Sequence, residues 1–145
     1  KQAVAVNKQL TRIMSRKGLL NTQQNTYNYT DPLYYINIQK VLIEGFFMNV
    51  AHRERGEAYS TAKNNQICAL HPSTCITNKP EWVIYNEFVL TSQNFLRICT
   101  KVEGKWLVSI APDYFQMENF PEGSSRRALK RHYAEIEHKK NNNNK

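Results

Sequence analysis

Between residues 57 and 111, short runs of apolar, β-branched and aromatic residues alternate with short runs of turn-forming residues. This texture predicts five β-strands, at residues 59–63, 66–71, 82–90, 95–102 and 105–111. The Asn64-Asn65 pair favours a tight turn between the first two strands, because asparagine tolerates a positive φ. Strands this short and this closely connected predict a small antiparallel barrel within residues 57–111.

Two barrel classes fit this pattern. Five strands with a helical turn near residues 71–74, between the second and third, suit the OB-fold, a five-stranded Greek-key barrel. An SH3-like barrel would give much the same pattern. The OB-fold holds oligonucleotides on one barrel face and two loops. If the fold is of this kind, the two loops are residues 63–66 and 101–105.

Helices are predicted on both sides of the barrel, which makes the fold class mainly β with flanking helices (α+β). Residues 2–17 carry an apolar stripe that ends at Gly18. Asp31 caps a second helix, which begins at Pro32 and continues to about residue 52. After the barrel, a helical turn is expected at residues 112–120, and a basic helix from Ser124 or Ser125 to residue 138.

Two segments are expected to lack regular structure. The Asn/Gln-rich residues 21–28 predict a mobile loop, and residues 141–144 predict a disordered tail. The expected organisation is therefore a helical segment at 1–56, a barrel domain at 57–120, and a basic helix with its tail at 121–145. Since the chain begins at Lys1 without a methionine, we expect it to be part of a longer or processed protein.

The formal charge of +8 is unevenly distributed. Residues 1–31 hold five basic and one acidic side chains, and residues 121–145 hold seven basic and three acidic ones. The central residues 32–120 hold eight of each and are neutral. Basic flanks attract polyanions by releasing counterions, although basic helices can also serve only solubility.

The sequence contains no recognisable catalytic motif. It has no phosphate-binding loop, no dinucleotide fingerprint and no zinc-protease helix, so we expect no ATP hydrolysis by this chain and no catalytic residue. Cys68, His71 and Cys75 have a spacing that zinc ligands can have, but core cysteines explain it more simply, and we expect no metal site. Three cysteines without a paired pattern predict reduced thiols in an intracellular protein, and no run of residues is apolar enough for a membrane span.

The candidate RNA-binding residues lie mainly in the two expected loops. Lysines there can reach phosphates, and amide side chains can bond sugars or backbone oxygens. Tyr59 and Tyr85 are ambiguous, because each is either a core residue or an outward ring on which a base could stack. The candidates are Lys63, Asn64, Asn65, Gln66, Lys101 and Lys105, then Lys79 and Arg97, and the two tyrosines. The alternative for each charged or amide residue is an ordinary solvated turn.

Several longer pieces of the sequence are familiar. They are GFFMNVAH (45–52), LHPST (70–74), KPEWVIYNEFVLT (79–91), RICT (97–100) and WLVSIAP (106–112). In this order and spacing they resemble the C-terminal region of DEAH-box RNA helicases, where the end of a helical bundle precedes an OB-fold. Residues 48–52, Thr74 and residues 119–121 are most similar to the member that dismantles spent spliceosomes and serves ribosome maturation. The resemblance fails in the Asn/Gln insert and beyond residue 131.

The resemblance implies a nuclear protein whose ATP- and magnesium-binding motor domains lie upstream of this chain. In that family the C-terminal modules help to form a channel for single-stranded RNA, couple RNA binding to ATP hydrolysis, and work with glycine-patch activator proteins. We therefore expect a monomeric module with three partners, namely single-stranded RNA, its own motor domains and such an activator, and with no bound cofactor. The alternative is a protein-interaction platform on which only the basic flanks touch RNA.

Overall fold

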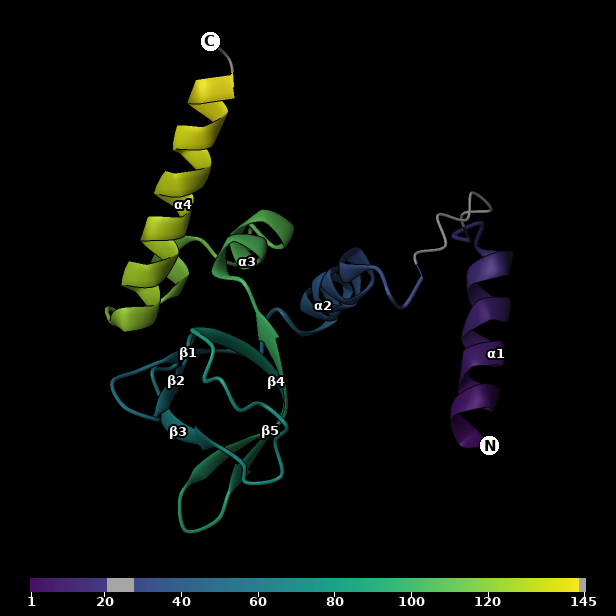
Figure 1. Cartoon of the computed structure of the whole chain (residues 1–145), viewed down its shortest axis with the longest axis horizontal. Helices are drawn as coiled ribbons and strands as arrows, with labels where there is room; N and C mark the ends of the chain where they lie inside the picture. The colour runs from purple at the N-terminus through teal and green to yellow at the C-terminus, as the bar shows by residue number, and fades with distance from the viewer. Residues whose placement is uncertain (21–27, 144–145) are drawn as a thin grey trace. The chain divides into compact units, whose positions relative to one another are not determined.

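The computed structural model describes residues 1–20 and 28–143 and divides the chain into two compact units, residues 1–34 and 35–145 (Figure 1). Of the expected mobile loop at residues 21–28, only Asn28 is among the described residues. In the first unit, α1 (Gln2–Arg16) confirms the first predicted helix. Gly18 has a φ of +65°, and its backbone N–H donates to the carbonyl of Ser15, so glycine ends the helix as expected.

Helix α2 (Pro32–Phe46) begins where the sequence predicts. The carboxylate of Asp31 accepts a hydrogen bond from the backbone N–H of Leu33 at 2.8 Å, which is the expected cap. The helix ends six residues earlier than expected, and β1 (Val50–Arg53) follows. The prediction of helix to residue 52 is wrong because this segment gains partners on both sides, Ala51 lying opposite Thr61 in β2 and Val83 in β4.

The predicted five-stranded barrel is confirmed, with a different first strand. Its other strands are β2 (Tyr59–Thr61), β3 (Ile67–Leu70), β4 (Trp82–Leu90) and β5 (Asn94–Val102). The closed order is β1-β2-β3-β5-β4, and every pair is antiparallel except β3 with β5. At residues 71–74 there is one hydrogen-bonded turn, from the N–H of Thr74 to the carbonyl of His71, rather than a helix.

The expected fifth strand at residues 105–111 is wrong, because this segment forms helix α3 (Gly104–Ile110). Strand β5 already pairs with both β3 and β4, and β4 pairs with β1, so the closed barrel offers no free edge to a further strand. As a helix, the segment places Gly104, Leu107 and Val108 on one buried face. The barrel therefore occupies residues 50–102 rather than 57–111.

The chain ends in a short 3-10 helix, η1 (Met117–Asn119), and in α4 (Ser124–Asn143). Helix η1 lies within the helical turn predicted at residues 112–120. Helix α4 begins at the predicted serine but continues through residues 141–143, which we expected to be disordered, whereas residue 144 lies outside the described part. Of the helices in the described part, none is both long and apolar enough to cross a membrane.

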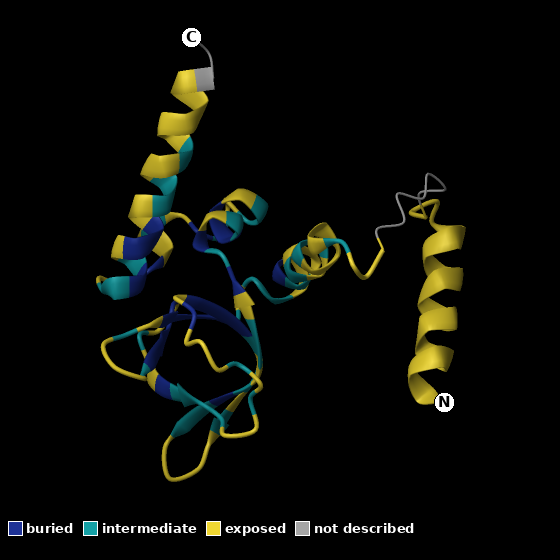
Figure 2. Cartoon of the chain, viewed as in Figure 1, coloured by how far each residue is buried: buried dark blue, intermediate teal, exposed yellow. Residues whose placement is uncertain are grey.

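Buried residues, drawn dark blue in Figure 2, lie in the barrel strands, in α3 and near the start of α4. The apolar ones form two clusters, which lie on opposite faces of β4. Val83 packs with Ala51, Tyr59, Cys68 and Leu96 inside the barrel. Its neighbours Trp82 and Ile84 point the other way, because side chains alternate along a strand. They join a larger cluster with buried residues of α3 and α4, including Leu107, Val108, Ala128 and Leu129. The C-terminal helices are thus part of the barrel domain's core.

Candidate nucleic-acid interface

The position of β1 changes which loops flank the binding face. Oligonucleotide-binding barrels of this class use the face of the second and third strands, with the loops that join strands one to two and four to five. With β1 at Val50–Arg53, these loops are residues 54–58 and 91–93. The loops that we predicted occupy other positions in the fold: residues 63–66 connect β2 with β3, and residues 101–105 lead from β5 into α3.

A groove of about 490 Å³ lies between the two flanking loops. It is lined from one side by Glu57, Ala58, Ile67, Cys68 and Ala69, and from the other by Leu90, Ser92, Gln93 and Asn94. Its volume falls in the range of ordinary ligand sites. The predicted strands at residues 82–90 and 95–102 leave a turn between them, but we expected no binding role there, because the strand before it was counted as the third.

The groove is mostly apolar, and its polar rim carries a single charged lining residue. Ile67 and Leu90 are 60% and 73% exposed, and Ser92 and Gln93 offer hydroxyl and amide groups. None of the lining residues is aromatic, so this groove provides no ring on which a base can stack. Its only charged lining residue, Glu57, forms an ion pair with Lys79. The groove therefore suits the neutral parts of a ligand better than its phosphates.

Three of the five predicted cations are already paired with carboxylates. Besides Lys79, Arg97 contacts Glu87 at 3.0 Å and Lys101 contacts Glu103 at 3.7 Å. Exposed pairs of this kind contribute little free energy, so a phosphate can compete for them. Lys63 and Lys105 are exposed and have no ion-pair partner among the described carboxylates.

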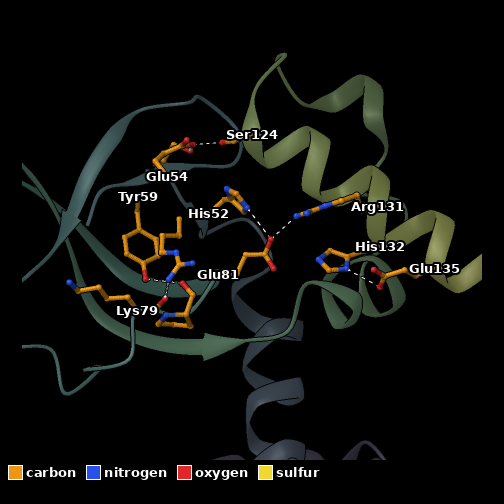
Figure 3. Close-up of polar contacts among 12 residues, drawn as sticks. His52, Glu54, Tyr59, Lys79, Glu81, Ser124, Arg131, His132 and Glu135 are labelled. Atoms are coloured by element: carbon orange, nitrogen blue, oxygen red, sulfur yellow. Dashed lines mark hydrogen bonds and ion pairs between the residues drawn. The ribbon is translucent and has the colours of Figure 1, made fainter. Parts of the chain in front are cut away.

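Tyr59 is a core residue rather than an outward ring. It is 0% exposed, and its hydroxyl donates to the carbonyl of Pro80 at 2.8 Å (Figure 3). Tyr85 is half-buried and lines a separate apolar hollow with Leu42 and Phe46 of α2. Burial raises the pKa of both hydroxyls. Neither tyrosine lies in the groove.

The predicted turn at Asn64-Asn65 is confirmed. Asn65 has a φ of +51°, and its side-chain amide donates to the carbonyl of Glu122 at 3.0 Å. Asn65 therefore joins the turn to the start of α4, whereas Asn64 and Gln66 are exposed. Sequence reasoning missed this contact, because nothing in the local sequence indicates a partner 57 residues away.

The three cysteines are free thiols in different environments. Burial raises the pKa of Cys68 to about 12 and that of Cys99 to about 11, whereas Cys75 is exposed. His71, from the zinc-like spacing, has its Nδ1 2.8 Å from the hydroxyl of Ser73. Among the described residues, no three His, Cys, Asp or Glu side chains gather in a way that could hold a metal ion.

These environments predict a strong difference in thiol reactivity. At pH 8, iodoacetamide is expected to modify Cys75 first and to reach one equivalent before Cys68 or Cys99 reacts. Thiolates are the nucleophiles, and the thiols of the buried Cys68 and the half-buried Cys99 hold their protons. Peptide mapping by mass spectrometry measures this order. In urea all three should react together. Equal rates in the folded protein would contradict the burial of Cys68 and Cys99.

The comparison with known families agrees with this geometry. Residues 38–114 match the family described as oligonucleotide/oligosaccharide-binding (OB)-fold. The matched range contains most of α2, the whole barrel and α3, and such a barrel indicates nucleic-acid binding. Since the match covers more than half of the 145 residues, the chain belongs to the oligonucleotide/oligosaccharide-binding (OB)-fold family.

Proposed function

We propose that the chain is the C-terminal accessory module of a DEAH-box RNA helicase of mRNA splicing and ribosome biogenesis, and that it binds single-stranded RNA. The observation that carries the proposal is where the helicase-like pieces of sequence lie. WVIYNEFVL is β4, RICT belongs to β5, and WLVSI lies in α3, all within the OB-fold match. These pieces build the barrel and one of the helices packed on it, as expected of a family resemblance that reflects a shared domain.

On this proposal the chain regulates ATP hydrolysis without performing it. The nucleotide and its magnesium ion would be bound by motor domains elsewhere in the parent protein, which would work in the nucleus. The motor domains and a glycine-patch activator would be its protein partners, and the module itself would be a monomer. Support for this division of labour comes from the sequence, which holds no phosphate-binding loop.

The chain is expected to bind RNA weakly and with little preference for RNA sequence. Lysines and arginines would contact phosphates, while the hydroxyl and amide groups of Ser92 and Gln93 would bond sugars or backbone oxygens at the groove. Because the groove has no aromatic lining residue, base stacking there would add little affinity. Phosphate contacts would then dominate, and they carry no sequence information.

A protein-docking role is the second candidate, and one observation favours it. The groove exposes Ile67 and Leu90, and the nearby Lys79 is paired with Glu57. An apolar groove whose one charged lining residue is already paired fits a partner protein as readily as a nucleic acid. In that case the barrel would dock on the motor or an activator, and RNA would touch the basic flanks alone.

Salt-dependent binding of single-stranded RNA tests the proposal. The complete chain is titrated against a labelled oligouridylate at several salt concentrations, and fluorescence anisotropy gives the affinity. If ~4–6 phosphates are neutralised, log affinity should fall against log salt with a slope of about −3 to −4. Affinity without salt dependence would refute binding through phosphates, and no binding even at low salt would refute RNA binding. The docking role would then be the better explanation of the barrel.

A further inference from the structure

The turn between β2 and β3 is fixed to the first turn of α4. Besides the hydrogen bond from Asn65 to the carbonyl of Glu122, the hydroxyl of Ser125 lies 3.5 Å from the side-chain oxygen of Asn65. Ser125 is 0% exposed, and a Cβ added at Gly123 would lie 3.0 Å from the amide nitrogen of Asn65. A buried hydroxyl and a close-packed glycine leave the turn and the helix little freedom to move apart.

We call this connection between the β2–β3 turn and the start of α4 the joint, and a second contact supports it. Glu54 accepts hydrogen bonds from the hydroxyls of Ser60 in β2, at 2.5 Å, and of Ser124 at the start of α4 (Figure 3). Partial burial raises the pKa of Glu54, but the two hydroxyls outweigh it and hold the pKa below its ordinary value. Glu54 is therefore ionised, and its carboxylate ties β2 to the start of α4 as the common acceptor of the two hydroxyls.

Cationic side chains extend from both halves of this joint. Lys63 and Asn64 directly precede Asn65, and Arg126 and Arg127 directly follow Ser125. Arg126 is paired with Glu122 at 2.5 Å. Ala128 and Leu129 are buried, whereas Arg127 and Lys130 lie among the exposed residues of α4. Within the described part of the chain, neither of these two nor Lys63 has a carboxylate at ion-pair distance.

We propose that Lys63 and Asn64 of the turn and Arg127 and Lys130 of α4 form one continuous surface that binds the sugar–phosphate backbone of single-stranded RNA. This proposal rests on the RNA-binding function proposed above and states where the phosphates bind. Three cations without a carboxylate at ion-pair distance in the described part of the chain can neutralise phosphates, and the amide of Asn64 can bond a phosphate or sugar oxygen. The surface combines a barrel turn with the basic C-terminal flank. From the sequence alone, these two regions were alternative predictions for the RNA-binding site.

Two triple variants of the complete chain test the location. The first is Lys63→Gln, Arg127→Gln and Lys130→Gln; the matched control is Lys40→Gln, Lys101→Gln and Lys105→Gln. Both remove three positive charges from exposed positions of the same unit. The probe is a labelled oligouridylate, and circular dichroism melting shows whether each variant is folded. A duplex RNA of the same length tests whether the surface binds a double helix instead.

The first variant should weaken oligouridylate binding about tenfold. It should also reduce the magnitude of the slope of log affinity against log salt by about 2, since each lost phosphate contact lowers that slope by about 0.7. The control should lose less than about threefold, because charges far from the RNA are screened. Equal losses in both variants, or a larger loss in the control, would refute the surface while leaving RNA binding intact. Tighter binding of the duplex would refute the single-stranded ligand. No binding by the unmodified chain would refute both proposals.

Discussion

Replacing Leu129 with alanine is expected to lower the free energy of unfolding by about 2–5 kcal/mol. Leu129 is 0% exposed in α4 and packs in the cluster that joins the helices to the barrel. The shorter side chain loses its transfer free energy and leaves a cavity that the surrounding core fills only in part. Urea denaturation followed by circular dichroism measures the change. The slope of the unfolding free energy against urea concentration should remain that of the unmodified protein.

The matched control is Leu90→Ala, the same chemical change at a side chain that is 73% exposed. Surface substitutions of this kind usually change stability by about 0.5 kcal/mol or less. If the two variants had equal midpoints, α4 would not be packed on the barrel. The joint between α4 and the β2–β3 turn, and with it the proposed RNA surface, would then have no structural basis.

Alanine at Gly104 is expected to destabilise the protein by about 1–3 kcal/mol, although it adds a single methyl group. Its Cβ would lie 2.2 Å from Nε2 of His132 and 2.7 Å from Nε1 of Trp82. Gly104 is buried, so these rings have to move within a packed interior. Thermal unfolding of the variant should show a lower midpoint with an unchanged circular dichroism spectrum at low temperature.

Two further variants identify the cause. Gly45→Ala in α2 has no heavy atom within 4 Å of the new Cβ, so it should leave stability unchanged or raise it by up to about 1 kcal/mol. His132→Ala removes the nearer ring, so combining it with Gly104→Ala should cost less than the two single changes added together. If the losses of stability in the two single variants added up to that of the double variant, α3 and α4 would not approach each other closely at Gly104.

Local chemistry predicted much of the fold. The glycine after α1, the Asp31 cap of α2 and the positive-φ Asn65 each act through a few neighbouring residues, so the sequence reveals them. Residues 50–53 and 105–111 are different, because a short apolar run fits a strand or a buried helix equally well. Which one forms depends on barrel closure, which gives residues 50–53 two strand partners and leaves residues 105–111 none.

The candidate site was harder to predict, for the same reason. Counting the strands from residue 59 instead of residue 50 shifted every loop by one place, so Ser92 and Gln93 received no role. Tyr59 is buried because it packs inside the barrel against Val83 and Leu96, where its hydroxyl reaches the carbonyl of Pro80, 21 residues away. The pairing of Lys79 with Glu57 and the joint between Asn65 and Glu122 are likewise long-range contacts that local sequence patterns do not contain.

The parallel pairing of β3 with β5 has a consequence for how the barrel folds. Strand β5 is the last strand to be synthesised, yet it fills the gap between β3 and β4, while β1 has to find β4 with Val50 opposite Ile84. A nascent chain that stops before Asn94 cannot close the barrel, because β3 and β4 each lack one of their two neighbours. We therefore expect the barrel to fold only after the ribosome has synthesised and released the chain through β5. Folding should then proceed in one cooperative step, at the slower rates typical of long-range pairing. A cut between β4 and β5, at residues 91–93, would for the same reason convert that step into a bimolecular association.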